Sequence, residues 1–431
     1  MTNILIINVH SSCNIGDDAL TLVTIQQLRE NFPECHLTLT IDDPRHGVEG
    51  EQVIGSLFHW VKPIGTGGSS KWHIPRLIGL LPTTLIPLLT WRITGKPAWL
   101  LTPMVLRTLL QAYFKADLIV SKPGGFLYSS GIGLVFLISI YSMALAIFTR
   151  KPLYIFPQSI GPLRHWWERT LLRWLLSNAR LVMLREEISY HLLTSFMGTS
   201  TRFMILPDPA FAFPAASPET ANTWLIQHGI NKSSGQPLLG ITVVDWMAED
   251  PTFQDQEKYE TAIAAAARYF INQYSGKVIF FIQVWGPSFS QDDRVPTQRM
   301  AANLQDVTEN VVLAQDIIDP QLLKALYGYM DIFVGTRMHS NIFALSQSVP
   351  VIAIGYQPKT KGILRMLNLD RWMIPIEDVD ESRLPEMLSL LFEQRDIIAN
   401  SLSTMLPTII EKANQPGNIV AQDFQKFNQS L

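Results

Sequence analysis

Residues 331–364 read DIFVGTRMHSNIFALSQSVPVIAIGYQPKTKGIL. This stretch contains two short apolar runs, at 332–335 and 351–355, and each is followed by a segment that suits a helix. Strands that are apolar on both faces and joined by helices are typical of a parallel sheet covered on both sides. The stretch therefore predicts strand, helix, strand and helix, and places this part of the chain in the α/β class.

The same alternation extends over most of the 431 residues. Further strands are predicted at 3–9, 37–41, 118–121, 153–157, 181–184, 238–244, 277–284 and 311–313. The chain is too long for one ordinary core and has room for two domains. We therefore predict two doubly wound, Rossmann-like domains facing a cleft, with ligands at the carboxyl ends of the strands.

A segment rich in Pro, Ala and Ser, residues 211–222, separates the two series of strands and helices. We expect an N-terminal α/β domain at 1–212, a linker at 213–222 and a C-terminal α/β domain at 223–431. The last helices are candidates for packing back onto the N-terminal domain. A basic, apolar insertion is expected at about 60–115.

Composition excludes several classes of protein. Hydrophobic residues make up 47% of the chain and charged residues 16%, which is typical of a globular protein rather than a disordered one. The net charge of −3 gives no reason to expect a nucleic-acid partner. Cys13 and Cys35 form no CxxC pair, and the opening MTNILIINVH looks like a buried strand rather than a signal peptide. We therefore expect a cytoplasmic location.

Charge is distributed unevenly along the chain. Between residues 52 and 167 the one acidic residue is Asp117, whereas basic residues are frequent and alternate with tryptophans and with the run LIGLLPTTLIPLL at 77–89. Cations beside apolar side chains favour contact with an anionic membrane surface. The alternative is that the apolar runs are core helices whose edges are solvated by the basic residues. The uncharged run at 132–148 is short for a membrane span, and its place between two strands favours a buried helix.

The first candidate motif, HSSCNIGDDAL at 10–20, joins a predicted strand to a predicted helix. Its glycine lets the backbone approach a ligand, and the helix start offers unpaired N–H groups. Asp17 and Asp18 lie at that start. One of them could simply cap the helix, which leaves the other as a carboxylate in the cleft. The motif is not a GxGxxG fingerprint, so a dinucleotide site is disfavoured.

Two further motifs place small and polar residues at strand ends. SKPGGFLYSSG at 121–131 contains Gly124 and Gly125, which would allow a positive φ and bare backbone toward a substrate, or would form a plain tight turn. FPQSIGPL at 156–163 contains Ser159 in a similar position. We predict that Gly124, Gly125 and Ser159 contact substrate.

VMLREEISYHLL at 182–193 places Arg185 at a strand end, where its guanidinium can bind a carboxylate or phosphate. LPDPAF at 206–211 fixes Asp208 between prolines, as a cleft carboxylate or as a turn-former. Both residues are predicted to bind substrate. The alternative is an ion pair between Arg185 and Asp208 or one of the neighbouring glutamates.

The opening stretch is the most specific motif. Arg337 ends a strand, His339 and Ser340 begin a helix, and Lys359 begins the next. Cations and two helix N-termini at one end of adjacent strands favour a small, multiply charged anion. We therefore predict Arg337, Ser340 and Lys359 as substrate-binding residues.

These motifs, in this order, resemble the polysaccharide pyruvyl transferase family: NIGDDAL, PGG, QSIGP, REE-x-S, PDPAF, then RMHS and PVIAIGY-x-PK. The resemblance runs from residue 3 to about 364. It implies a GT-B-like fold with the acceptor on the N-terminal and the donor on the C-terminal domain. It also implies phosphoenolpyruvate as donor, bound by Arg185, His339 and Lys359. The basic insertion departs from the family pattern and leaves the acceptor open, with a polyprenyl-linked glycan as one candidate.

The implied reaction needs a proton donor and a proton acceptor. His339 is the candidate general acid or phosphate ligand, because the pKa of histidine can be tuned near neutrality. Asp17 or Asp18 is the candidate base. No residues have metal-ligand spacing, so neither a metal nor a cofactor beyond the donor substrate is expected. The alternatives are a glycosyltransferase using a nucleotide sugar and a non-catalytic, membrane-associated scaffold of polysaccharide assembly. The insertion suits peripheral attachment to the inner face of the plasma membrane.

Overall fold

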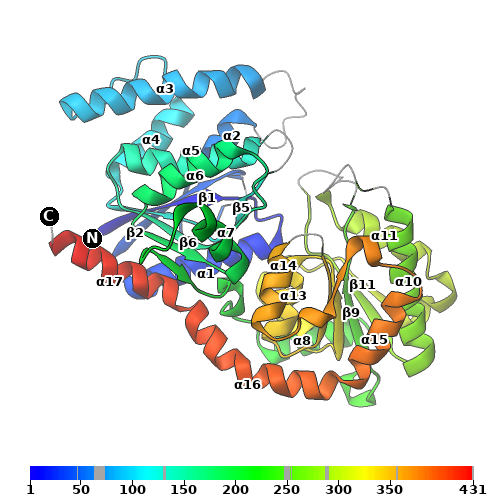
Figure 1. Cartoon of the computed structure of the whole chain (residues 1–431). Coiled ribbons are helices and arrows are strands. Elements are labelled where there is room, and N and C mark those ends of the chain that lie inside the picture. Colours follow the sequence, from blue (N-terminus) through cyan, green and yellow to red (C-terminus); the bar gives the residue numbers. More distant parts are fainter. Residues whose placement is uncertain are drawn as a thin grey trace. The chain divides into compact units, whose positions relative to one another are not determined.

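The computed structural model of the chain describes residues 1–45, 47–62, 73–129, 133–246, 253, 255–286, 291–355 and 358–429. The chain divides into two compact units (Figure 1). Unit 1 consists of Met1–Ser12, Leu20–Pro209 and Ala413–Leu431, and unit 2 of Cys13–Ala19 and Ala210–Lys412. Each unit is built around its own parallel sheet with alternating helices, so the predicted α/β class is confirmed.

The sheet of unit 1 has the strand order β3-β2-β1-β4-β6-β7-β8, and β5 pairs with β6. The strands are β1 (Thr2–Val9), β2 (Cys35–Ile41), β3 (Gln52–Gly55), β4 (Leu118–Ser121), β5 (Gly124–Leu127), β6 (Leu153–Ile160), β7 (Leu181–Leu184) and β8 (Phe203–Ile205). Every pairing is parallel. The strand order runs outward in both directions from β1 and β4, which makes the gap between them the topological switch point.

Two apolar cores cover the two faces of this sheet, because its strands carry apolar side chains on both sides. In β1, Leu5 and Ile7 belong to one core, whereas Ile4 and Ile6 belong to the other. The first core is completed by α2 (Leu57–Val61), α4 (Met104–Lys115), α5 (Leu134–Phe148), α6 (Trp166–Asn178) and α7 (Glu187–Met197). The second is completed by α1 (Ile15–Asn31) and α17 (Gln415–Gln429).

Helix α17, drawn in red in Figure 1, brings the end of the chain back to unit 1. The ring of Phe424 packs against Phe32 at a centroid distance of 6.1 Å. Asp423 accepts hydrogen bonds from Tyr154, at 2.8 Å, and from Arg180, at 2.9 Å. Apolar packing and a partly buried polar anchor therefore hold this helix on the sheet.

The two apolar stretches of unit 1 behave differently. Helix α5 has most of its residues buried, so the predicted buried helix is confirmed over Leu134–Phe148; residues 130–132 lie outside the described part. The run at 77–89 belongs to α3 (His73–Thr94). Over the described residues, one helix is long and apolar enough to cross a membrane by length and composition, at Pro75–Thr94, and 22% of its apolar window is buried. Helix α3 thus contributes Leu80 and Leu88 to the first core but leaves most of its apolar window exposed.

The sheet of unit 2 has the order β11-β10-β9-β12-β13-β14, again all parallel. Its strands are β9 (Leu238–Thr242), β10 (Lys277–Phe281), β11 (Val311–Ala314), β12 (Ile332–Gly335), β13 (Val351–Gly355) and β14 (Met373–Pro375). Its helices are α8 (Pro218–Gln227), α10 (Gln256–Tyr274), α11 (Arg294–Ala302), α12 (Pro320–Tyr327), α13 (Met338–Ser346), α14 (Pro358–Met366), α15 (Arg383–Glu393) and α16 (Arg395–Ala413). The switch point of this sheet lies between β9 and β12.

Some boundaries differ from those predicted. Strand β6 continues to Ile160, so Ser159 lies within the strand rather than after it. Helix α8 begins at Pro218, inside the segment taken as the linker. The local reason is a strong start signal: Ser217 accepts a hydrogen bond from the backbone N–H of Thr220, and Pro218 occupies the first turn.

Candidate functional site

The strongest group of candidate residues lies at the carboxyl edge of the sheet of unit 2. Strand β12 leaves the switch point through Thr336 and Arg337, and α13 begins directly after them. Arg337 is the N-cap residue of α13, with φ −86° and ψ 134°, and its side chain makes no capping hydrogen bond. Its backbone thus starts the helix, while its guanidinium takes no part in capping it.

The guanidinium of Arg337 is held by a buried carboxylate. Its Nη2 lies 2.7 Å from Oδ1 of Asp293, and its Nε donates to Oδ2 at 3.3 Å. Asp293 has a side chain that is 1% exposed, whereas that of Arg337 is 16% exposed. The pair fixes the orientation of Arg337 and balances much of its charge, while the arginine side chain stays slightly exposed.

His339 packs directly on the backbone of the N-terminal motif. A Cβ placed on Gly16 would come within 2.3 Å of Nδ1 of His339 and within 2.4 Å of its Cγ, so glycine is required at position 16. Gly16 and His339 belong to the same compact unit, although the sequence separates them widely. The structure therefore brings His339 to the helix turn that carries Asp17 and Asp18.

The cap of α1 is not one of the two aspartates. Asn14 caps this helix, because its Oδ1 accepts hydrogen bonds from the backbone N–H of Gly16, at 3.1 Å, and of Asp17, at 3.4 Å. The capping alternative proposed for Asp17 and Asp18 is thereby corrected. Both are half-buried residues in the first turn of α1, where a negative charge is stabilised by the helix dipole.

Backbone hydrogen bonds anchor this motif to unit 2. The N–H of Ile15 donates to the carbonyl of Gln283 at 3.0 Å, and the N–H of Trp285 donates to the carbonyl of Cys13 at 2.8 Å. Gln283 follows β10, and its buried Nε2 has no hydrogen-bond partner among the described residues. Gln283 is a candidate ligand-binding residue that sequence reasoning missed; an isolated glutamine in an apolar segment gave no signal.

Ser340 lies at the predicted place but is fully buried. Its hydroxyl lies 2.9 Å from that of Thr242 and donates to the carbonyl of Arg337 at 2.6 Å. These contacts tie β9 to the start of α13. The geometry gives Ser340 a structural part in the site rather than a hydroxyl facing substrate.

Lys359 is a half-buried residue in the first turn of α14, which begins at Pro358. Strands β12 and β13 are neighbours in the sheet, so the helices that follow them, α13 and α14, begin at the same edge. The N-termini of α13 and α14 therefore lie at one edge of one sheet, together with Arg337 and Lys359. Such an arrangement favours anions.

A buried tyrosine supports the same edge. The hydroxyl of Tyr259 lies 2.9 Å from that of Thr336. Burial raises the pKa of Tyr259 above its ordinary value, and the hydrogen bond from Thr336 opposes this only in part. Burial likewise raises the pKa of Tyr327, which donates to Gln283 at 3.0 Å. Both phenols stay protonated near neutral pH, and their hydrogen bonds support the structure at this edge.

Three predicted residues of unit 1 form a buried cluster. Arg185 follows β7, and its Nη1 lies 2.6 Å from Oδ2 of Asp208 while its Nε donates to the hydroxyl of Ser159 at 2.6 Å. The side chains of Arg185 and Asp208 are 1% and 0% exposed. The ion pair foreseen as the alternative is thus present, and Asp208 already neutralises the arginine. The Nη2 atom of Arg185 is buried without a hydrogen-bond partner in the described part of the chain.

Gly124 and Gly125 do not form the predicted turn. They belong to β5, which pairs in parallel with β6. A Cβ on Gly124 would come within 3.1 Å of the ring of Phe126. The prediction of a turn with positive φ is therefore wrong: these positions are extended, and Gly124 makes room for an aromatic side chain.

A histidine–aspartate pair at the carboxyl edge of unit 1 was missed. His10 follows β1 and Asp42 follows the neighbouring β2, and His10 Nδ1 lies 2.9 Å from Asp42 Oδ2. Ser56 donates to the other carboxylate oxygen at 2.5 Å. His10 is 29% exposed, so an oriented imidazole faces solvent at this edge. The two residues are far apart in the sequence, and only the pairing of β1 with β2 brings them together.

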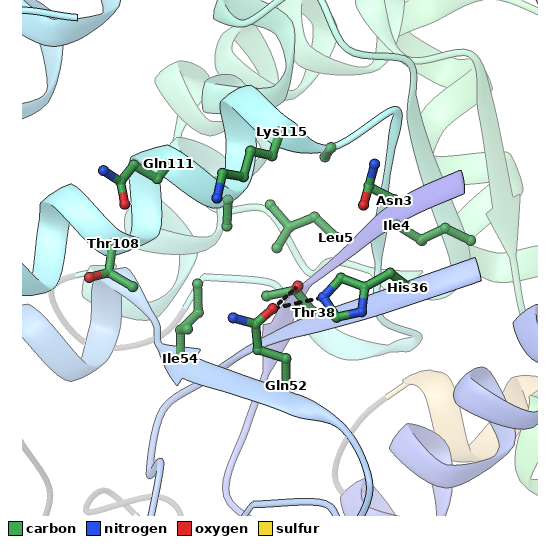
Figure 2. A pocket seen from close by; sticks show the side chains of 12 residues that line it. Asn3, Ile4, Leu5, His36, Thr38, Gln52, Ile54, Thr108, Gln111 and Lys115 are labelled. Carbon is green, nitrogen blue, oxygen red and sulfur yellow. Dashed lines mark hydrogen bonds between the residues drawn. The ribbon is translucent and has the colours of Figure 1, made fainter. Parts of the chain in front are cut away.

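The structure describes one pocket of about 260 Å³ in unit 1, away from these edges (Figure 2). It lies at the amino-terminal halves of β1 and β2 and beside α4. Figure 2 shows Gln52 joined by hydrogen bonds to both His36 and Thr38, with Lys115 and Gln111 on the helix. None of the residues predicted to act in the site is among its described lining residues. Over the same described residues, no three His, Cys, Asp or Glu side chains form a group that could hold a metal ion.

Solved structures resemble the chain over its whole length in fold. HepE of Anabaena, solved with UDP and glucose, gives a TM-score of 0.56 at 13% identity and covers 99% of this chain and 100% of its own. The UDP-GlcNAc 2-epimerase of Neisseria meningitidis, bound to UDP-GlcNAc, gives 0.56 at 12% identity, with 99% and 100% covered. At these identities the likeness concerns the fold, which is of the GT-B glycosyltransferase and epimerase type.

The family described as polysaccharide pyruvyl transferase matches residues 14–358, which is most of the chain. This protein belongs to that family. The match begins at Asn14, the cap of α1, and ends one residue before Lys359. The amylovoran biosynthesis protein AmsJ of Erwinia amylovora is 21% identical over 282 residues, covering 65% of this chain and 66% of AmsJ, just under two thirds of the relative's length. Membership places the chain among transferases that modify polysaccharides.

Proposed function

We propose that this protein transfers a pyruvyl group, as a ketal, from phosphoenolpyruvate to a sugar of an exopolysaccharide or cell-wall glycan. The observation that carries the proposal is the close packing of His339 on Gly16, which brings the NIGDDAL and RMHS motifs together in one unit. Family membership supports the reaction class. Cys13 and Cys35 form no disulfide, which suits the reducing cytoplasm, where we place the protein.

The donor is assigned to unit 2. Phosphoenolpyruvate carries a carboxylate and a phosphate, and the N-termini of α13 and α14 with Arg337 and Lys359 supply matching donors and positive charge. Asp293 keeps Arg337 oriented, and the arginine side chain remains 16% exposed. Arg185, which Asp208 neutralises in a buried cluster, receives a structural role in this proposal.

The chemistry needs one acid and one base. A sugar hydroxyl attacks C2 of the donor while C3 takes up a proton, so that the methylene becomes a methyl group. Inorganic phosphate then leaves C2, and a second hydroxyl of the same sugar attacks that carbon to close the ketal ring. Of the two protons lost by the hydroxyls, one matches the proton taken up by C3 and the other leaves with the phosphate. His339 supplies the proton to C3 or holds the departing phosphate, and Asp17 or Asp18 in the turn beside it accepts the hydroxyl proton.

The test combines purified protein, phosphoenolpyruvate and candidate glycans, with phosphate release and acceptor mass as readouts. We expect donor-dependent phosphate release and an acceptor heavier by one pyruvate less water. His339→Gln should lower the rate by about 10²–10⁴-fold. Lys359→Met should raise KM for phosphoenolpyruvate about tenfold, because a charge-assisted contact is lost.

The matched control is His228→Gln, since His228 also lies in unit 2 but stacks on Trp224 at 3.8 Å, apart from these motifs. It should keep full activity. Undiminished turnover by the His339→Gln protein would refute the assigned site. Release of UDP from a sugar nucleotide, with phosphoenolpyruvate inert, would replace the proposed reaction by glycosyl transfer.

A further inference from the structure

Helix α3 and the segment after it display an unusual apolar surface. Its members, which we call the α3 patch, are large aliphatic side chains with more than half of their surface exposed: Ile78, Leu81, Leu89, Ile93, Leu100, Leu101 and Met104. Exposed apolar groups that gather in one place mark a site of interaction, whereas single ones need no explanation. Leu101 even has a φ of +59°, a costly conformation for a leucine, with its side chain 78% exposed.

Four members of the patch lie on α3 itself, where the exposed positions 78, 81, 89 and 93 repeat at helical spacing. Other positions of the same helix, Leu80 and Leu88, are buried in the core of unit 1. Thr84 joins Tyr141 of α5 at 2.5 Å. Figure 1 shows α3 as an outer helix, lying beyond α4 and α5. The helix is therefore fixed to unit 1 along one face and presents the other.

The polar groups of α3 are satisfied internally. The hydroxyls of Thr83, Thr84 and Thr90 donate to backbone carbonyls one turn earlier in the helix. Pro87 has no N–H for the carbonyl of Thr83, and Thr102 donates to that carbonyl instead, at 2.9 Å. Such pairing is needed where water is scarce, because an unpaired backbone group in hydrocarbon is costly.

Charge around the patch has a single sign. No acidic residue occurs from residue 52 to residue 116. Residues 77–91 are uncharged, with Arg76 before them and Arg92 and Lys96 after them. Arg92 and Lys96 are exposed. An apolar stripe bordered by cations matches the interface of a bilayer that contains anionic lipids.

We propose that the α3 patch docks unit 1 on an anionic phospholipid bilayer, with α3 lying in the plane of the interface. The uncharged run is shorter than the roughly 20 residues of a span, and Leu80 and Leu88 hold one side of the helix against the protein. The exposed members of the patch are not aromatic: Trp91 stacks on Phe114 at 4.8 Å, and Trp99 lies beneath Arg107 at 5.5 Å, so both tryptophans are half-buried in contacts within unit 1. Trp72, also considered from the sequence, lies outside the described residues.

This surface is independent of the proposed reaction, and its test uses no activity assay. Full-length protein is sedimented with vesicles of phosphatidylcholine alone and with vesicles that also contain phosphatidylglycerol. We expect binding to the anionic vesicles that weakens with salt. Leu89→Glu/Ile93→Glu should lower the partition coefficient at least about tenfold, since two apolar side chains leave the interface and two negative charges enter it.

The matched control is Ile226→Glu/Ile397→Glu, which makes the same charge change at two positions that are 71% and 73% exposed in unit 2. It should bind vesicles as the wild type does. Equal recovery in the supernatant with and without anionic vesicles overturns the proposal. Light scattering provides the remaining check: a wild-type dimer that the Leu89→Glu/Ile93→Glu substitution dissociates, without vesicle binding, would assign the patch to a second copy of the chain.

Discussion

Each of the two sheets carries an arginine–aspartate ion pair at its carboxyl edge, but the two pairs differ in their exposure. In unit 1, Arg185 pairs with Asp208 and both side chains are almost fully buried. In unit 2, Arg337 pairs with an equally buried Asp293 but keeps 16% of its own side chain exposed at the start of α13. Each arginine follows a parallel strand and is oriented by an aspartate from another segment.

The comparison shows how the exposure of such an ion pair decides whether it serves stability alone or can also serve ligand binding. A fully buried pair must be complete, because a charge left alone in the interior is expensive. A pair with one accessible side can present its arginine to a ligand while the aspartate maintains its geometry. Arg185 is therefore suited to holding β6, β7 and β8 together, and Arg337 to meeting an anion.

The largest expected effect concerns stability. Asp208→Asn should lower the free energy of unfolding by about 3–5 kcal/mol, because Arg185 would keep its charge in the interior without a counterion. Asp293→Asn should cost less, about 1–3 kcal/mol, because water can reach Arg337 and the amide oxygen can still accept from Val284. Urea unfolding of both variants measures the difference.

The matched control removes both charges at once. Arg185→Met/Asp208→Leu should recover most of the stability lost in Asp208→Asn, since two apolar side chains replace a buried pair at little cost. If Asp293→Asn proved as damaging as Asp208→Asn, the distinction between the two edges would fail.

The next effect concerns activity in unit 2. Gly16→Ala should reduce donor-dependent phosphate release about 100-fold, because the new methyl group would displace the ring of His339. Gly79→Ala is the control, since Gly79 lies in α3 and a Cβ there meets no atom within 4 Å. It should leave the rate unchanged. A Gly16→Ala protein of normal activity would show that the position of His339 does not matter.

The smallest expected effect comes from replacing one buried tyrosine in each unit. Tyr113 donates to the carbonyl of Ser142 at 2.8 Å, and Tyr259 lies 2.9 Å from the hydroxyl of Thr336. Either change to Phe should cost about 1 kcal/mol. Burial raises the pKa of both phenols, so the folded state keeps their protons while the unfolded chain loses them near pH 10.

The stability that the folded protein gains from the raised pKa values of Tyr113 and Tyr259 is accordingly complete below about pH 10 and falls as the pH rises above it. The unfolding free energy, measured from pH 8 to 11, should decline less steeply in Tyr113→Phe and Tyr259→Phe than in the wild type. An unchanged slope would mean that these phenols ionise as easily in the folded protein as in the unfolded one.

Much of the fold could be predicted because it depends on local patterns. The strands at 118–121, 181–184, 332–335 and 351–355 were expected with the bounds that the structure has, since short apolar runs between turn residues leave few alternatives. For individual site residues, the surroundings of a side chain were harder to foresee than the strands. Ser340 and Ser159 were expected to face substrate, yet both are buried and bonded within the protein. Whether a polar side chain faces inward depends on neighbours that are distant in sequence.

The sequence by itself determined the α/β class and the order of motifs, because hydrophobic periodicity and glycine placement act over a few residues. Only the tertiary structure decided that Gly16 supports His339, that His10 meets Asp42, and that one apolar run is buried in α5 while another is displayed on α3. The physical reason is that strand pairing and packing join residues from remote segments, and burial follows from that assembly rather than from the apolar character of a run.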